Sequence, residues 1–147
     1  MLRLDKYATH LEPLIRAAVE ARKGILELGC GNYSTPILRE ISASKGIPFL
    51  CQASDISWAA QFDGVQIVDW TNWSPPAGSW DVVFLDSEEA TKDRIRRLPV
   101  LAKFASIVVM HDADAAMAHP WFNECVSAFP KSDIYKKHRP WTMTLYA

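Results

Sequence analysis

The sequence predicts an α/β fold, in which a mostly parallel, doubly wound sheet of seven strands carries helices on both faces and ends in an antiparallel strand. Apolar runs of strand length alternate with segments of helical periodicity along the 147 residues. Two runs, Val82–Leu85 and Ile107–Met110, are apolar at every position. This pattern is typical of parallel strands that helices cover on both sides.

Capping and stop signals define the first two helices. Thr9 and Glu12 have the spacing of a capping box, and Gly24 follows as a stop. Apolar residues of helical spacing in this segment are Tyr7, Leu11, Leu14, Ile15, Ala18 and Val19. Thr35 and Pro36 have the pattern of an N-cap and first residue of the second helix.

The remaining elements follow in alternation. The predicted strands are 24–29, 48–53, 65–69, 81–86, 106–110, 134–138 and 141–146. Further helices are predicted over 57–62, 91–105 and 120–129. We expect Pro99 to kink or split the second of these, because proline lacks the N–H that a helix interior needs.

Composition favours a single globular domain over residues 1–147, with a helix within 1–23 packed on the sheet. A net charge of −1 gives no electrostatic footprint for nucleic acid. No apolar run approaches the roughly 18 residues of a membrane span, and the opening residues lack the apolar stretch of a signal peptide. Three separated cysteines indicate reduced thiols, so we expect a cytoplasmic protein without nucleic-acid or membrane partners.

The fold class predicts where a ligand binds. In open α/β sheets, ligands bind outside the carboxyl ends of the strands, beside the first strand. That rule selects residues 29–35, 53–55, 69–70, 86–89 and 111–114.

A glycine loop follows the first strand. Gly29 and Gly31 allow a tight turn that a ligand can approach, and the next helix offers free N–H groups to a phosphate or a carboxylate. The dinucleotide fingerprint fits poorly, because Ser34 occupies its third glycine position. The P-loop pattern is absent, since no Gly-Lys-Ser/Thr follows.

The segment Glu27–Thr35 (E-L-G-C-G-N-Y-S-T) resembles motif I of the class I S-adenosylmethionine-dependent methyltransferases. Residues 81–86 are similar to the family's fourth strand with its terminal acid, 108–113 to the fifth strand with an "HDA" ending, and 141–146 to the closing strand. The resemblance implies a Rossmann-like fold, S-adenosylmethionine as cofactor, and methyl transfer to oxygen or nitrogen of a small acceptor.

By this resemblance, the loop backbone would face the methionine part of the cofactor, and Glu27 would help bind its amino group directly or through water. Ser34 and Thr35 would cap the helix and touch the carboxylate. The alternative is that Glu27 only hydrogen-bonds the loop while the other two are caps. The residues that the resemblance assigns to the cofactor here are Glu27, Gly29, Cys30, Gly31, Asn32, Ser34 and Thr35.

The second strand departs from the family pattern. It usually ends in an acid that binds both ribose hydroxyls, whereas Ala53 stands at this position. Asp55 would reach the ribose only through a reshaped turn, and its alternative role is an N-cap. After the third strand, Asp69 could accept from the adenine amino group and Trp70 could stack on the base. Alternatively, Trp70 belongs to an aromatic cluster with the other tryptophans of its loop.

Methyl transfer needs an in-line nucleophile and a base for its proton. His111, after the fifth strand, is the histidine best placed to be that base, and a structural hydrogen-bonding role is its alternative. His119 is interpreted as a helix cap, and His10 and His138 as surface residues.

Carboxylates end the two central strands. Asp86 and Asp112 could converge with Asp114 around a divalent cation such as Mg²⁺. Metal-dependent O-methyltransferases usually carry Asn or Asp where Ala113 stands, which favours turn capping over metal binding. We therefore expect His111, Asp112 and Asp86 at the reaction centre, with no metal ligand among them.

The predicted elements use nearly the whole chain and leave no lid or substrate-recognition insertion. The acceptor must then be bound by the loops 70–80 and 112–119, by an oligomer partner or by another protein. With Ala53, this motivates an alternative function, a non-catalytic methyltransferase-fold protein that serves as an interaction module. A nicotinamide-dependent reductase is disfavoured by Ser34 and by the lack of a Tyr-x-x-x-Lys pair.

Overall fold

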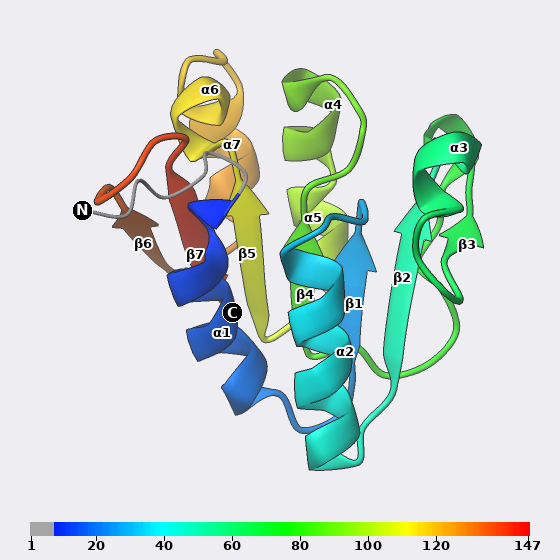
Figure 1. Ribbon diagram of the computed structural model, residues 1–147. Coiled ribbons are helices and arrows are strands. Elements are labelled where there is room, and N and C mark those ends of the chain that lie inside the picture. Colours follow the sequence, from blue (N-terminus) through cyan, green and yellow to red (C-terminus); the bar gives the residue numbers. More distant parts are fainter. Residues whose placement is uncertain (1–7) are drawn as a thin grey trace.

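Residues 8–147 are described by a computed structural model, and the first seven residues, including Tyr7 of the predicted first helix, lie outside that description. The strands are β1 (Ile25–Leu28), β2 (Phe49–Ala53), β3 (Gln66–Ile67), β4 (Val82–Leu85), β5 (Ile107–His111), β6 (Lys131–Tyr135) and β7 (Thr142–Tyr146). They form one sheet in the order β3-β2-β1-β4-β5-β7-β6 (Figure 1). β1 to β5 pair in parallel, and β7 runs antiparallel to both neighbours. The predicted doubly wound sheet with an antiparallel last strand is confirmed.

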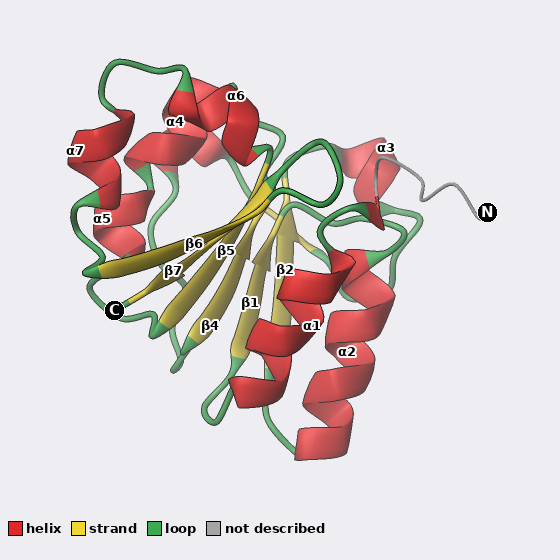
Figure 2. Ribbon diagram, turned by 90° about the vertical axis from the view of Figure 1, so that its left-hand side faces the viewer, coloured by secondary structure: helices red, strands yellow, loops and turns green. Residues whose placement is uncertain are grey.

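Helices cover both faces of the sheet (Figure 2). One face carries α1 (Leu11–Glu20) and α2 (Ser34–Lys45), and the other carries α4 (Thr91–Arg96), α5 (Leu98–Leu101), α6 (Ala113–Met117) and α7 (Phe122–Val126). A short α3 (Ile56–Ala59) follows β2, and a single 3₁₀ turn, η2 (Trp70–Asn72), follows β3. The chain crosses from one side of β1 to the other between β3 and β4, so the switch point of the sheet lies beside β1.

Two apolar cores, one on each face, stabilise this arrangement. Every residue of β1 and β4 is buried, and alternate side chains face opposite cores. Leu26 and Val83 pack toward the α4 and α5 side, whereas Ile25 and Phe84 pack toward α1 and α2. The two runs that are apolar at every position in the sequence therefore form β4 and most of β5, which helices cover on both faces. No helix of residues 8–147 has the length and apolar character that crossing a membrane requires.

The helix starts differ from the predicted ones. α1 has His10 at its N-cap position without a side-chain cap, because Glu12 pairs with Arg16 rather than closing a capping box. α2 begins at Ser34, one residue before the predicted N-cap. The hydroxyl of Thr35 is directed at the carboxylate of Glu27 instead. Both predicted caps were therefore wrong.

Other boundaries confirm or shorten the prediction. The helical segment around Pro99 is split, with α4 ending at Arg96 and α5 starting at Leu98, as expected. β3 pairs over only two residues rather than the predicted five. α6 lies in a segment predicted as loop, because Asp112 adopts a left-handed conformation (φ 57°, ψ 40°) that turns the chain sharply after β5.

Candidate functional site

A cavity of about 690 Å³ opens at the carboxyl ends of β1, β4 and β5. Its volume lies in the range of small-molecule sites. Of the residues predicted from the sequence, the lining includes Cys30, Gly31, Asn32, Ser34, Asp86, His111 and Asp112. It also includes Tyr33, from the predicted range 29–35, and three residues that were not predicted for the site, namely His10, Trp58 and Pro140. The expected edge of the sheet thus holds a cavity, built from segments far apart in the sequence.

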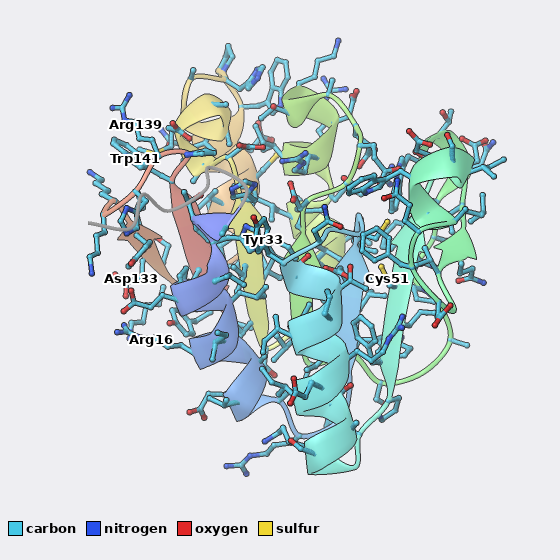
Figure 3. The ribbon with its side chains drawn as sticks, in the orientation of Figure 1. Arg16, Tyr33, Cys51, Asp133, Arg139 and Trp141 are labelled. Atoms are coloured by element: carbon cyan, nitrogen blue, oxygen red, sulfur yellow. The ribbon has the colours of Figure 1, made fainter. Side chains whose placement is uncertain are left out.

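A second cavity, of about 780 Å³, lies between α1, the edge strand β6 and its neighbour β7. Its lining includes Arg16 on α1 and Asp133 on β6, whereas Tyr33 marks the first cavity at the start of α2 (Figure 3). None of the predicted site residues lines this second cavity.

The glycine loop is held tightly against the neighbouring strand. Gly29 has φ +97°, and a Cβ there would lie 2.0 Å from the carbonyl oxygen of Asp86. Only glycine fits both the conformation and the space. The N–H of Gly31 donates to the hydroxyl of Thr35 at 2.9 Å, and that hydroxyl donates to Glu27 at 2.7 Å. The loop is therefore tied to β1 through one threonine.

Glu27 lies beneath the loop and outside the cavity lining. Its side chain is fully buried, and this burial raises the pKa of the carboxyl to about 7 against the opposing hydrogen bonds from Ser34 and Thr35. One carboxylate oxygen accepts from Thr35, and the other has no partner among the described residues. This geometry matches the alternative in which Glu27 holds the loop.

Trp58 of α3 clamps the loop from the other side. Its indole N–H donates to the carbonyl oxygen of Cys30 at 2.8 Å. Asp55 holds this tryptophan in place, because its carboxylate caps α3 by accepting from the backbone N–H of Trp58 at 2.9 Å. That backbone bond and the Ser57 hydroxyl lower the pKa of Asp55. Asp55 is thus the N-cap that the sequence offered as the alternative to a ribose ligand.

A carboxylate does lie beyond β2, but it comes from a different loop. One oxygen of Glu88, after β4, accepts from the N–H and hydroxyl of Ser54, both at 2.5 Å, and from the N–H of Asp55 at 3.0 Å. Glu88 lies in the range 86–89 selected from the sequence, but its contact with the loop after β2 was not predicted. The contact joins segments more than 30 residues apart, and no local pattern signals it.

Asp69 and Trp70 line a separate cavity of about 650 Å³. Asp69 caps η2 by accepting from Thr71, and Trp70 is largely buried in the core. The guanidinium carbon of Arg97 lies 5.8 Å from the Trp70 ring centre and 5.1 Å from that of Trp73. Trp70 therefore belongs to the aromatic cluster that the sequence left open as its second role.

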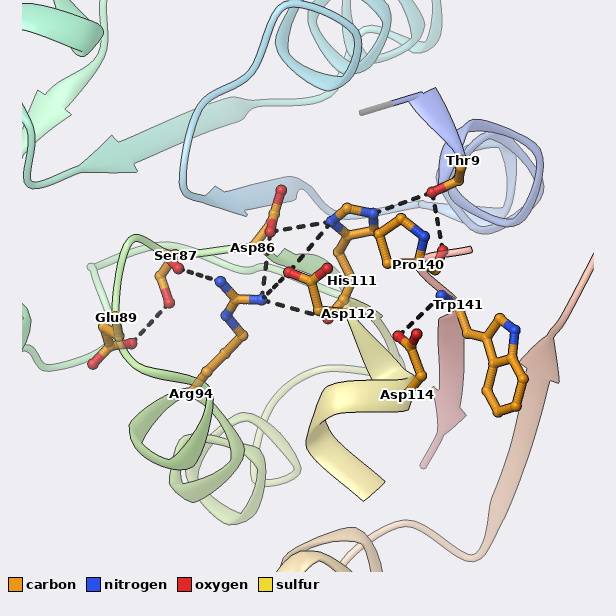
Figure 4. A network of polar contacts seen from close by, with 10 residues as sticks. All are labelled: Thr9, Asp86, Ser87, Glu89, Arg94, His111, Asp112, Asp114, Pro140 and Trp141. Carbon is orange, nitrogen blue, oxygen red and sulfur yellow. Dashed lines mark hydrogen bonds and ion pairs between the residues drawn. The ribbon is translucent and has the colours of Figure 1, made fainter. Parts of the chain in front are cut away.

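A polar network occupies the ends of β4 and β5 (Figure 4). Nδ1 of His111 lies 3.4 Å from Asp86 and 3.8 Å from Asp112, and Nε2 lies 3.3 Å from the Thr9 hydroxyl. Burial opposes a charge on the ring, but the hydrogen bond and negative charge of Asp86, with the charge of Asp112, raise the pKa of His111. The network therefore favours the protonated imidazole.

A divalent cation does not fit this cluster. Ligand atoms of Asp86, His111 and Asp112 lie within 4.8 Å of one another. However, Nη1 of Arg94 already lies 3.5 Å from Asp86 and 3.2 Å from Asp112. Asp114 is directed elsewhere, since it accepts from the N–H of Trp141. The guanidinium supplies the positive charge that a metal would bring.

His10 is not the surface residue that the sequence suggested. It is 3% exposed, and its ring centre lies 4.9 Å from that of Phe84 and 4.8 Å from that of His111. Neither ring nitrogen has a hydrogen-bond partner among residues 8–147. The prediction failed because periodicity locates the start of α1 but not the contacts of the residue preceding it.

Comparisons with known proteins agree with this architecture. No family model and no curated protein sequence matches the chain. Among solved structures, it resembles the methyltransferase PaMTH1 of Podospora anserina bound to S-adenosylhomocysteine, with 14% identity over 97% of this chain and 79% of that one, and a TM-score of 0.59. It also resembles the O-methyltransferase TomG of Streptomyces achromogenes in complex with S-adenosylmethionine. The identity is 18% over 99% of this chain and 82% of that one, and the TM-score is 0.58.

A 16S rRNA methyltransferase of T. Thermophilus is also similar, with 12% identity, a TM-score of 0.53, and coverage of 92% of this chain and 38% of that one. TomG is described as an O-methyltransferase of tomaymycin synthesis and the third protein as an rRNA methyltransferase, so the likeness concerns the scaffold. The chain has the fold of the class I S-adenosylmethionine-dependent methyltransferases.

Proposed function

We propose that the chain is an S-adenosylmethionine-dependent methyltransferase that transfers a methyl group to oxygen or nitrogen of a small acceptor. The observation that carries this proposal is the shared cavity. The glycine loop 29–31, the start of α2 and the acids at the ends of β4 and β5 all open onto it. Solved structures of the same fold hold S-adenosylmethionine or S-adenosylhomocysteine, which supports this ligand.

The methionine part of the cofactor would lie over the loop. Gly31 leaves the backbone accessible, with Cys30 and Asn32 beside it, whereas Gly29 lets the loop pack against Asp86. The N-terminus of α2, at Ser34, offers N–H groups to the carboxylate of the ligand.

The amino group of the cofactor would be bound by Glu27, below the loop. The unpartnered oxygen of Glu27 would accept from that group through water, because Glu27 lies below the cavity rather than in its lining. Thr35 keeps the loop and Glu27 in register.

Glu88 is better placed than Asp55 to bind the ribose. Both carboxylates lie beyond β2, but Asp55 is committed to the cap of α3, whereas Glu88 reaches across from another loop. At the reaction centre, Asp86 and Asp112 orient His111 toward the methyl group.

Calorimetric titration with S-adenosylhomocysteine and S-adenosylmethionine tests the proposal, with NAD as a control ligand. We expect micromolar binding of the two sulfur ligands and none of NAD. Binding by the wild type but not by Gly31→Val would locate the ligand at the loop.

A second function is motivated by Ala53, which ends β2 at the position where the resemblance predicts a ribose-binding acid. If neither sulfur ligand binds at millimolar concentration, the chain is a non-catalytic interaction module of the same fold.

A further inference from the structure

An unpartnered imidazole faces the proposed reaction centre. His10 lines the cavity together with Asp86 and His111, and it is 3% exposed. Both of its ring nitrogens are buried without a hydrogen-bond partner among residues 8–147. Burying a polar group without a hydrogen-bond partner is unfavourable. A ligand that brings a hydrogen-bond donor to His10 would recover that free energy.

His111 cannot receive a proton in the same way, because both of its nitrogens are already engaged. The hydroxyl of Thr9 donates its hydrogen to the carbonyl oxygen of Pro140 at 3.0 Å. In its contact with Nε2 of His111, that hydroxyl is therefore the acceptor, and the imidazole is the donor. Nδ1 faces the carboxylate of Asp86, which accepts as well. Two donated hydrogens correspond to the protonated ring.

The neighbours of His10 keep its own ring neutral. Burial and, to a smaller extent, the charge of His111 lower the pKa of His10 to about 4, against the opposing charge of Asp86. A neutral imidazole always has one nitrogen with a free lone pair. Of the two histidines, only His10 therefore has a hydrogen-bond acceptor to offer.

We propose that His10 is a catalytic residue that accepts the hydrogen bond of the attacking hydroxyl and takes up its proton. This inference rests on the proposed function. The acceptor oxygen forms a bond to the methyl carbon, and the carbon–sulfur bond breaks with its electron pair going to sulfur. The hydroxyl proton passes to the free nitrogen of His10. The products are the methyl ether, S-adenosylhomocysteine and a His10 imidazolium that returns its proton to solvent.

The lining also indicates the class of acceptor. Asp86 and Asp112 line the cavity, and the cations beside them, Arg94 and His111, are already engaged with these two carboxylates. The lining contains no lysine or arginine, so a carboxylate or phosphate on the acceptor would lose its hydration there without gaining an ionic partner. Tyr33 and Trp58 add aromatic surface to the same cavity. The acceptor is accordingly an uncharged hydroxyl compound with an aromatic ring, a phenol in the simplest case.

Two measurements test this assignment. The first adds phenol, and separately benzoate, to the protein with and without S-adenosylhomocysteine and follows the imidazole ¹⁵N resonances. We expect phenol, and not benzoate, to shift the signal that disappears in His10→Gln. The second measures methyl transfer to a set of uncharged phenols by wild type, His10→Gln and His138→Gln, the last being a histidine outside the cavity lining.

We expect His10→Gln to lower kcat/KM about 10²–10⁴-fold, the range for loss of a general base, with unchanged affinity for S-adenosylhomocysteine. His138→Gln should match the wild type.

A wild-type rate in His10→Gln, or a His10 signal that phenol does not move, would overturn the assignment. If His10→Gln fails to fold, the resonance shift in the wild type still decides. Lack of S-adenosylhomocysteine binding by the wild type would instead refute the proposed function, and the phenol titration without it would still test His10.

Discussion

Arg94 of α4 and Asp112 after β5 form an ion pair at the edge of the cavity, with 3.2 Å between Nη1 and Oδ2. The arginine side chain is 8% exposed. The same nitrogen lies 3.5 Å from Asp86, and Nη2 donates to the carbonyl oxygen of Ser87 at 2.5 Å. One buried cation thus compensates two carboxylates that would otherwise repel each other at neighbouring strand ends.

Replacing this cation should destabilise the protein and create a metal site. Arg94→Met leaves only His111 to compensate Asp86 and Asp112, whose side chains are 29% and 35% exposed, so the cost should stay below the roughly 3–5 kcal/mol of a fully buried pair. Urea unfolding should show that loss, and Mg²⁺ should recover part of it in the variant but leave the wild type unchanged. Arg16→Met, in an exposed pair with Glu12, should cost no more than about 1 kcal/mol. Stabilisation of the wild type by Mg²⁺ would contradict this account.

The two carboxylates beyond β2 should differ in their effect on cofactor affinity. Glu88→Gln should weaken S-adenosylhomocysteine binding about tenfold, since each charge-assisted hydrogen bond contributes about 1.5–3 kcal/mol. Asp55→Asn should leave the affinity close to that of the wild type and lower the melting temperature, because its carboxylate caps α3.

An analogue of S-adenosylhomocysteine without ribose hydroxyls distinguishes loss of the ribose contact from a general loss of ligand affinity in the variant. It should bind wild type and Glu88→Gln equally. The reverse ranking of the Glu88 and Asp55 variants would assign the ribose to Asp55.

The fold could be predicted because its signals are local. Apolar runs such as Val82–Leu85 determine which strands are covered on both faces, and Pro99 interrupts its helix wherever it packs. The position of Asp86 and His111 also follows from the sequence, since strand ends meet at one edge of a parallel sheet. The place of His10 in the site could not be found in this way, and neither could the contact that Glu88 makes, although Glu88 lies in the selected range 86–89. Their environments are created by contacts with segments distant in the chain, such as His111 and Ser54.

The glycine loop should tolerate change at its two glycines differently. A Cβ at Gly31 would meet only the Ser34 hydroxyl, at 3.2 Å, so Gly31→Val should fold. Its branched side chain would project where the ligand approaches the backbone, and S-adenosylhomocysteine binding should fall at least about 100-fold, by clash with a bound ligand. At Gly29 a Cβ would lie 2.0 Å from the carbonyl oxygen of Asp86, so Gly29→Ala should lose stability first. Calorimetry and thermal melting of both variants distinguish the effects, and undiminished binding by Gly31→Val would place the ligand elsewhere.

Burial of Glu27 should make stability depend on pH. The carboxyl has a folded-state pKa of about 7 and an ordinary value of 4.5, so the folded protein binds the proton more tightly than the unfolded chain does. Its contribution is fully present below pH 4.5 and is lost as the pH rises through 7.

Glu27→Gln cannot ionise and escapes this loss. The free energy of unfolding of the wild type should therefore fall relative to Glu27→Gln by about 1.4 kcal/mol per pH unit across that window and then level off. Urea unfolding from pH 5 to 8.5 measures the difference, with the exposed Glu20→Gln as baseline. A constant difference between wild type and Glu27→Gln would show that the carboxyl is ionised throughout, and that a cation or donor compensates its second oxygen.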